Sequence, residues 1–123
     1  MSRRPHFSDI EVRHTKKRGR GVFSIAIFRP GETIEICPVI VLKDEDIQND
    51  LARFAFWWPG RPPGAAIALG YGSLYNHSAN PNAHFRIAKK AKEIHIIAKT
   101  PIEHGQEIFI DYQYPDGYDF KVK

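Results

Sequence analysis

The residues best suited to chemistry lie in one segment, residues 74–82, which reads Leu-Tyr-Asn-His-Ser-Ala-Asn-Pro-Asn. Its asparagine, serine and histidine side chains offer hydrogen-bond donors and acceptors without a permanent charge, which suits the recognition of a polar ligand. The same side chains bond nearby backbone, and Pro81 keeps Asn80 out of the helical region, so neither a strand nor a helix is expected here. The segment therefore predicts either a long turn or a binding site.

Two further segments carry candidate chemistry. Gly19-Arg20-Gly21 lacks the third glycine and the following helix of a dinucleotide fingerprint, so it predicts a tight turn or a close approach of backbone to another ligand. Residues 111–120 hold three tyrosines and a phenylalanine. This aromatic segment predicts either a cover of the core or a cage for an alkylated ammonium group.

Metal and disulfide chemistry are not expected. The six histidines show no spacing typical of metal ligands, and the single cysteine, Cys37, precedes a proline in an apolar stretch, where a small core side chain is expected. No apolar run reaches the roughly 18–20 residues of a membrane span, and the N-terminus lacks the apolar stretch of a signal peptide. These features favour an intracellular protein without a membrane partner.

The charges are unevenly distributed around a net charge of +4. Residues 1–20 hold seven Lys or Arg side chains against two carboxylates, whereas residues 43–50 hold four carboxylates against one lysine. Residues 107–119 hold four carboxylates and no Lys or Arg. Each patch is compatible with a solvated surface, but the acidic segments also suit a basic ligand.

The elements that must position these residues are mostly short strands. At 123 residues, with 42% hydrophobic residues, nine Gly and nine Pro, the chain predicts one domain with a core and many turns. Alternating polarity and β-branched residues predict strands at 10–15, 22–23, 33–42, 65–69, 83–88, 93–98 and 107–112. Pro38 is expected to break the third of these, and residues 83–98 to form a hairpin.

One short helix is expected after the third strand. Asp44 can cap its start, and Ile47, Leu51, Phe54 and Trp58 would share one helical face. The Pro/Gly-rich stretch at 59–64 ends this pattern. The sequence therefore predicts a mostly β domain whose single helix runs from Asp44 to about Phe54.

Three motifs, in this order, resemble those of SET domains. Arg18-Gly19-Arg20-Gly21-Val22-Phe23 resembles the GxG motif. Tyr75-Asn76-His77-Ser78-Ala79-Asn80-Pro81-Asn82 resembles the NHSxxPN motif, and Gly105-Gln106-Glu107-Ile108-Phe109-Ile110-Asp111-Tyr112 resembles the terminal strand that ends in Asp-Tyr. The resemblance covers about residues 10–118 and is strongest to the small stand-alone SET proteins of bacteria and large viruses.

The resemblance implies a single SET domain over residues 1–123, with a variable insert at about 43–64. The implied fold is mostly β, a β-clip of short strands with one short helix in the insert. It also implies a C-terminal pseudoknot, in which the chain end threads under the segment before the NHS motif.

The implied activity is that of a protein-lysine N-methyltransferase that uses S-adenosylmethionine. The residues that would bind this cofactor are Arg18, Gly19, Arg20, Gly21, Asn76, His77 and Tyr112. Tyr112 would be the catalytic tyrosine at the methyl-transfer channel, with Tyr71 and Tyr114 beside it. The residues that would line the substrate channel are Phe85, Ile110, Trp57, Tyr118 and Phe120.

Two features of this channel are left open by the sequence. The aromatic residues of the insert either line the substrate groove together, or Phe54 and Trp58 belong to the core while Phe56 and Trp57 do not contribute. Phe85 or Ile110 would occupy the position where family members that add one methyl group often carry tyrosine. An apolar residue there favours the addition of more than one methyl group.

The implied chemistry is consistent with the absence of a metal motif. Methyl transfer from a sulfonium to an amine is an in-line displacement, and it needs a neutral lysine held in line. A lysine pKa near 10.4 makes deprotonation at neutral pH cost about 4 kcal/mol, and an apolar channel lowers that pKa. Tyr112 is expected to orient the amine rather than act as general base, because a phenol titrates near pH 10.

The acidic segments favour a basic protein substrate, such as a histone-like tail or a ribosomal protein. One alternative is a SET-fold binding module with little catalytic activity. Another is a nucleic-acid binder that uses the basic residues 1–20, but these lack interleaved aromatics, so no specific nucleic acid is expected. Tyr118 and Phe120, or the second subunit of a homodimer, would close the lysine channel. The expected location is the cytoplasm, or a host nucleus if host chromatin is the substrate.

Overall fold

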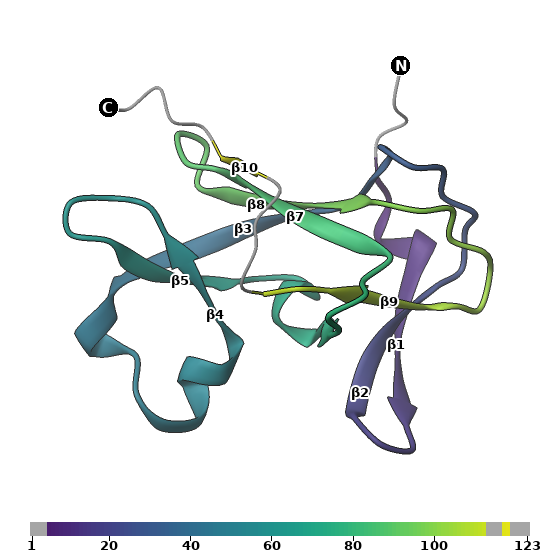
Figure 1. Cartoon of the computed structure of the whole chain (residues 1–123), viewed down its shortest axis with the longest axis horizontal. Coiled ribbons are helices and arrows are strands. Elements are labelled where there is room, and N and C mark those ends of the chain that lie inside the picture. The colour runs from purple at the N-terminus through teal and green to yellow at the C-terminus, as the bar shows by residue number, and fades with distance from the viewer. Residues whose placement is uncertain (1–4, 113–116, 119–123) are drawn as a thin grey trace.

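The computed structural model describes residues 5–112 and the backbone of residues 117 and 118. The elements of this part are short strands joined by turns and 3-10 helices (Figure 1), which confirms the mostly β prediction. In chain order they are η1 (Phe7–Asp9), β1 (Ile10–Thr15), β2 (Gly19–Ser24), β3 (Thr33–Lys43), η2 (Asp44–Asp46), η3 (Asn49–Phe54), β4 (Ala55–Trp58), β5 (Gly64–Ala68), η4 (Gly72–Leu74), β6 (Asn76–His77), β7 (Ala83–Ala88), β8 (Glu93–Ala98), β9 (Glu107–Ile110) and β10 (Gly117–Tyr118).

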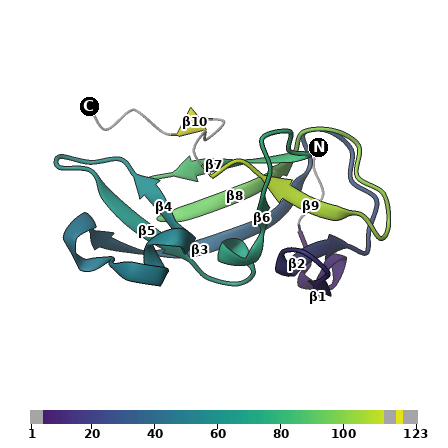
Figure 2. The same ribbon diagram turned by 60° about the horizontal axis from the view of Figure 1, so that its bottom comes forward.

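The strands form two sheets. The smaller sheet has the order β1-β2-β9-β6, and the larger has the order β10-β7-β8-β3-β5-β4. Figures 1 and 2 show β1 and β2 at one end of the molecule and β4, β5 and the insert at the other. Strand β9 lies between β2 and β6, so three segments that are far apart in the sequence meet in the smaller sheet.

The core lies between the inward faces of these sheets. Its largest fully buried side chains include Phe28, Phe56, Phe85 and Ile34, and each such side chain contributes roughly 1.5–3 kcal/mol by leaving water. Along β7 the burial alternates with the period of two expected of a strand. The predicted hairpin is confirmed, because β7 and β8 pair from Ala83 opposite Ala98 to Ala88 opposite Glu93.

The prediction of one helix from Asp44 to Phe54 is wrong. The insert holds two 3-10 helices, η2 and η3, and then turns directly into β4. Trp58 lies on β4 opposite Gly64 and is buried, whereas Leu51 and Phe54 remain exposed. A helical face needs a partner to bury it, and here pairing with β5 buries Phe56 and Trp58 instead.

Two local predictions also need correction. Pro38 does not break β3, because the strand pairs with β8 up to Pro38 and with β5 from Val39 onward. The missing N–H of proline therefore falls where the strand changes partners. The tight turn predicted at Gly19-Arg20-Gly21 lies instead at residues 16–18, and β2 already begins at Gly19, which has a φ of +69°.

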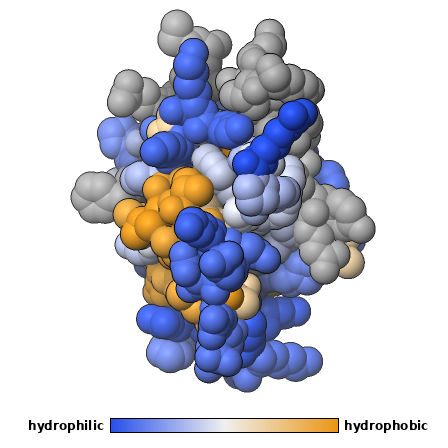
Figure 3. Space-filling model, turned by 90° about the vertical axis from the view of Figure 1, so that its left-hand side faces the viewer, coloured by the Kyte–Doolittle hydropathy of each residue, from blue (hydrophilic) through white to orange (hydrophobic). Residues whose placement is uncertain are grey.

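Figure 3 shows an apolar patch, surrounded by hydrophilic side chains, on the end of the molecule that lies at the left of Figure 1. The exposed large hydrophobic residues between positions 40 and 58 are Ile40, Val41, Leu51, Phe54 and Trp57. In the described residues, no helix is long and apolar enough to cross a membrane.

Candidate active site

The predicted crossing of the chain is built by β6 and β9. These strands run parallel, with Asn76 opposite Phe109 and His77 opposite Ile110. The backbone N–H of Ser78 continues the pairing by donating to the Ile110 carbonyl at 3.0 Å. The NHS segment thus lies directly beside β9, the strand of the third motif.

Asn82 secures this crossing. Its side-chain Nδ2 donates to the Glu107 carbonyl at 2.9 Å, and its Oδ1 accepts from the Phe109 N–H at 2.8 Å. One amide side chain therefore replaces a strand partner for two backbone groups of β9. This explains structurally why the motif ends in asparagine: Asn82 holds β9 in place.

The second glycine of the GxG motif makes room for Asn76. The Asn76 Nδ2 donates to the Arg20 carbonyl at 3.0 Å and to Glu107 Oε2 at 2.7 Å. A Cβ built at Gly21 would lie 2.3 Å from Glu107 Oε2 and 2.8 Å from Asn76 Nδ2. Gly21 thus leaves the space in which the three motifs meet. The two bonds use both amide hydrogens of Asn76, so its side chain can contact a ligand through Oδ1.

Tyr112 stands at the end of the crossing. Its hydroxyl donates to the Tyr75 carbonyl at 2.6 Å, and its ring packs on Phe56 with the ring centroids 4.8 Å apart. Its backbone N–H points to His77 Nδ1 at 3.4 Å. Burial raises the pKa of the Tyr112 hydroxyl well above its ordinary value, so this group remains protonated and cannot serve as a base.

A cavity of about 310 Å³ opens at this crossing. Five residues predicted from the sequence to bind the cofactor line it: Arg18, Arg20, Asn76, His77 and Tyr112. The other lining residues are Arg53, Phe54, Ser73, Leu74 and Tyr75. The Arg18 guanidinium also lies over the Phe109 ring, 5.1 Å from its centroid. The cavity therefore combines cationic, neutral polar and aromatic groups from four separate segments.

Other predicted site residues lie elsewhere. Gly19 and Gly21 adjoin the cavity in β2 but do not line it, and Tyr71 lies outside it with its backbone N–H bonded to Glu35. Phe85 and Ile110 are 1% and 0% exposed, so both belong to the core, and their place beside the lysine channel stays a prediction. Tyr114 and Phe120 lie outside the described residues, and of Tyr118 only the backbone, in β10, is described.

The structure resolves the alternatives for the insert aromatics in an unexpected way. Phe56 is buried and its ring contacts both Phe85 and Tyr112, while Trp57 is 45% exposed. Trp58 is in the core, as one alternative had it, but Phe54 is exposed and lines the cavity. Phe56 is therefore the insert residue that supports Tyr112.

Three residues at the site were missed by sequence reasoning: Glu35, Arg53 and Ser73. Arg53 and Phe54 reach the cavity because the Ser73 hydroxyl donates to the Phe54 carbonyl at 3.1 Å. Glu35 bonds the segment just before the NHS motif. The charged Glu35 in a strand rich in Ile and Val was the one signal in the sequence, whereas the insert residues carried none.

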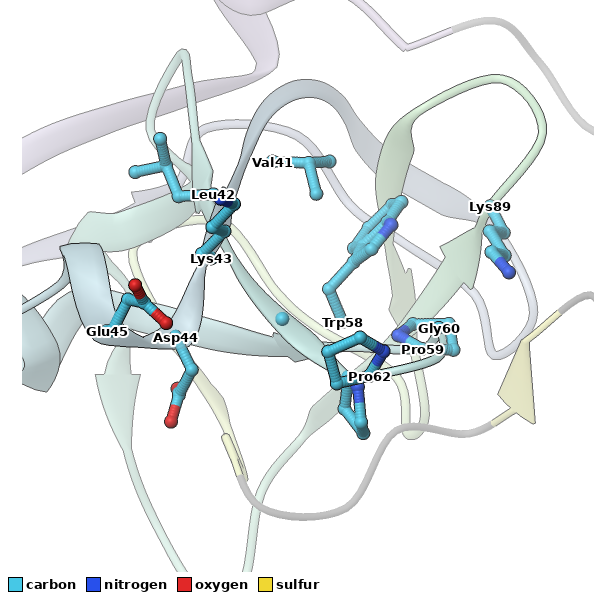
Figure 4. A pocket seen from close by; sticks show the side chains of 12 residues that line it. Val41, Leu42, Lys43, Asp44, Glu45, Trp58, Pro59, Gly60, Pro62 and Lys89 are labelled. Atoms are coloured by element: carbon cyan, nitrogen blue, oxygen red, sulfur yellow. The ribbon is translucent and has the colours of Figure 1, made fainter.

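A second and larger cavity, of about 900 Å³, lies at the far end of β3 (Figure 4). The close-up shows Trp58 at its centre and the carboxylates of Asp44 and Glu45 at one side. None of its lining residues belongs to the three motifs. Within the described part of the chain, no three His, Cys, Asp or Glu side chains are grouped so as to hold a metal ion.

The strand-rich fold and the crossing of three motifs at one cavity define a class of protein. Residues 19–113 match the SET domain family, so the chain belongs to that family. Over 110 residues it is 29% identical to a Schizosaccharomyces pombe protein named histone-lysine N-methyltransferase, H3 lysine-37 specific. That alignment covers 85% of this chain and 74% of the relative.

Solved structures agree with this assignment. A Plasmodium falciparum structure, described as that of a candidate histone methyltransferase, superposes with a TM-score of 0.70 at 32% identity, covering 86% of this chain and 94% of that chain. The CpSET8 structure from Cryptosporidium shares the fold, with a TM-score of 0.67 at 17% identity, covering 86% of this chain and 59% of that chain. The family and the S. pombe relative together support a lysine methyltransferase activity.

Proposed function

We propose that this chain is a protein-lysine N-methyltransferase that uses S-adenosylmethionine and acts on a basic protein, such as a histone-like tail or a ribosomal protein. The observation that carries the proposal is the position of the Tyr112 hydroxyl. It is fixed 2.6 Å from the Tyr75 carbonyl, and both residues line the 310 Å³ cavity together with Asn76 and His77.

The residues around the cavity suit S-adenosylmethionine. Arg18, Arg20 and Arg53 offer guanidinium groups for a carboxylate, and Asn76 Oδ1 offers an acceptor for an ammonium group. The cavity volume of about 310 Å³ is at the lower end of the roughly 300–1,000 Å³ typical of small-molecule sites. When bound, this cofactor supplies an electrophilic methyl group, and its sulfonium sulfur is left as a neutral thioether.

Tyr112 would orient the lysine. Its proton is directed to the Tyr75 carbonyl, so the lone pairs of its oxygen remain free to accept an N–H from the substrate amine. The buried ring of Phe56 supplies an apolar surface beside Tyr112, which favours the neutral form of an amine placed there. The lysine would therefore lose its proton to water before transfer, since Tyr112 does not accept it.

The insert supports a basic substrate. Its carboxylates, Asp44, Glu45, Asp46 and Asp50, are exposed, and they precede Arg53 and Phe54, which line the cavity. These exposed carboxylates would attract a lysine-rich segment to the insert. Such substrates place the activity inside the cell, in the cytoplasm or in a host nucleus.

The proposal is tested by incubating the protein with methyl-labelled S-adenosylmethionine and a panel of histones, ribosomal proteins and cell extract. Wild type should label a basic protein, and Tyr112→Phe should lose about 10²-fold in kcat, as expected for one donor or acceptor at a reacting centre. Tyr71→Phe is the matched variant: because Tyr71 does not line the cavity, it should lose much less.

Binding of S-adenosylhomocysteine, measured by calorimetry, separates the remaining outcomes. If wild type binds this product but labels no protein, the chain is a binding module and the proposal fails. Strong, salt-sensitive binding of DNA by Tyr112→Phe would favour a nucleic-acid function instead.

A further inference from the structure

Glu35 joins β3 to the segment that precedes the NHS motif. One carboxylate oxygen, Oε2, accepts the backbone N–H of Tyr71 at 2.9 Å, and the other, Oε1, accepts the Tyr75 hydroxyl at 2.7 Å. These partners lie 36 and 40 residues away in the sequence. Bonds to a charged acceptor are shorter and stronger than neutral ones, so this pair defines where residues 71–75 lie.

The loop is shaped to fit this carboxylate. A Cβ built at Gly70 would lie 2.5 Å from Glu35 Oε2, and the glycine has a φ of +67°. Further along, a Cβ at Gly72 would lie 2.5 Å from the Ala68 Cβ and 3.0 Å from Cys37 Sγ. The backbone of residues 70–72 therefore approaches β3 as closely as its atoms allow, with Glu35 at the point of contact.

The position of Tyr75 is passed on to Tyr112. Tyr75 is 2% exposed, and its carbonyl accepts the Tyr112 hydroxyl at 2.6 Å. Burial, together with the neighbouring Glu35 carboxylate, raises the pKa of the Tyr75 hydroxyl, which therefore stays protonated and continues to donate to Glu35. Glu35, Tyr75 and Tyr112 thus form one connected series of hydrogen bonds that reaches from β3 to the cavity.

We propose that Glu35 is a positioning residue for methyl transfer: it anchors Tyr75, whose carbonyl aims the Tyr112 hydroxyl at the reacting amine. The inference rests on the proposed function. A carboxylate suits this position, because both of its oxygens face donors. A glutamine could accept the Tyr71 N–H and donate to the Tyr75 oxygen, but both bonds would then be neutral and weaker, and the Tyr75 bond would run in the opposite direction.

The test is a double-mutant cycle in kcat with Glu35→Gln, Tyr112→Phe and the double variant. Glu35→Gln should lower kcat by about tenfold, the factor that corresponds to about 1.4 kcal/mol, because bonds to a charged acceptor become neutral ones. The KM for the protein substrate and the affinity for S-adenosylhomocysteine should change less than twofold. In the Tyr112→Phe background, Glu35→Gln should lower kcat less than twofold, because the hydroxyl it positions is gone.

Glu32→Gln is the matched control. Glu32 Oε1 accepts the backbone N–H of Arg29 at 2.7 Å in the turn before β3, so the same substitution removes a comparable bond away from the site. It should leave kcat unchanged. Glu35 has only a general structural role if Glu35→Gln lowers kcat by the same factor in wild type and in Tyr112→Phe. The same holds if Glu32→Gln lowers kcat as much as Glu35→Gln does. Either result overturns the inference.

A measurement independent of turnover separates failure of the inference from failure of the proposed function. With tyrosine labelled at the ζ carbon, the NMR signal of Tyr112 should shift in Glu35→Gln and stay in place in Glu32→Gln. The proposed function fails if wild type transfers no methyl group. The inference fails if the Tyr112 signal does not move in Glu35→Gln. If Glu35→Gln does not fold, Tyr75→Phe removes one of the two bonds and should give a smaller shift in the same direction.

Discussion

Replacing Gly21 by alanine tests whether the three motifs depend on one close contact. The added methyl group would lie 2.3 Å from Glu107 Oε2 and 2.8 Å from Asn76 Nδ2, so both side chains must move. Their mutual bond of 2.7 Å would be broken or stretched. Losing a bond to a charged group costs about 1.5–3 kcal/mol, and overpacking costs about 1–3 kcal/mol.

The free energy of unfolding of Gly21→Ala should therefore fall by about 2–4 kcal/mol in urea denaturation, since partial relaxation makes the two costs less than additive. Displacement of Asn76 should also weaken S-adenosylhomocysteine binding by about tenfold, the effect of one lost hydrogen bond. Calorimetric titration measures this second effect.

Gly31→Ala is the control for backbone strain. Gly31 has a φ of +90°, and nothing lies within 4 Å of its built Cβ, so alanine there is strained but meets no neighbour. It should lower stability by about 1–2 kcal/mol and leave product binding unchanged. The reasoning is refuted if Gly21→Ala binds the product like wild type and loses no more stability than Gly31→Ala.

Three further predictions concern the crossing and its tyrosines. Asn82→Ala should lower the free energy of unfolding by about 2–3 kcal/mol in urea denaturation, because two backbone groups of β9 lose their partner. A variant as stable as wild type would contradict this role of Asn82. Burial raises the pKa of Tyr75 and Tyr112, whereas the phenols of the unfolded chain titrate near pH 10. The two buried, neutral phenols therefore contribute fully to the free energy of unfolding below about pH 10, and this contribution is lost as the pH rises further. Denaturation between pH 8 and 11 should show that decline, and Tyr75→Phe should reduce it. Mass spectrometry of the product should show more than one methyl group on the lysine, since Phe85 and Ile110 are apolar; monomethyl-lysine alone would contradict this.

Local sequence patterns were enough to predict strands that bury one face. The alternation in residues 83–88 and 93–98 around a polar turn predicted the hairpin with its correct bounds, because burial of one face specifies the register. The resemblance of the three motifs to SET domains pointed to five of the residues that line the cavity. In both cases, the information lies in neighbouring residue types.

The insert could not be predicted in this way. Ile47, Leu51, Phe54 and Trp58 have helical spacing, but burial of Trp58 depends on pairing between β4 and β5. Strand β5 in turn pairs with β3, and Gly64 allows this approach, because a Cβ there would lie 2.6 Å from the Leu42 carbonyl. Contacts of this kind join strands that are separated in the sequence, so local residue patterns do not predict them.

By itself, the sequence determined the mostly β fold, the order of the motifs and the polar residues at the crossing. Only the tertiary structure decided how they act: Gly21 makes room for Asn76, Asn82 holds β9, and Phe56 packs on Tyr112. Glu35 reaches Tyr75 across 40 residues of sequence. Residue type sets which hydrogen bonds a side chain can make, but the packing of distant strands sets which partner it meets.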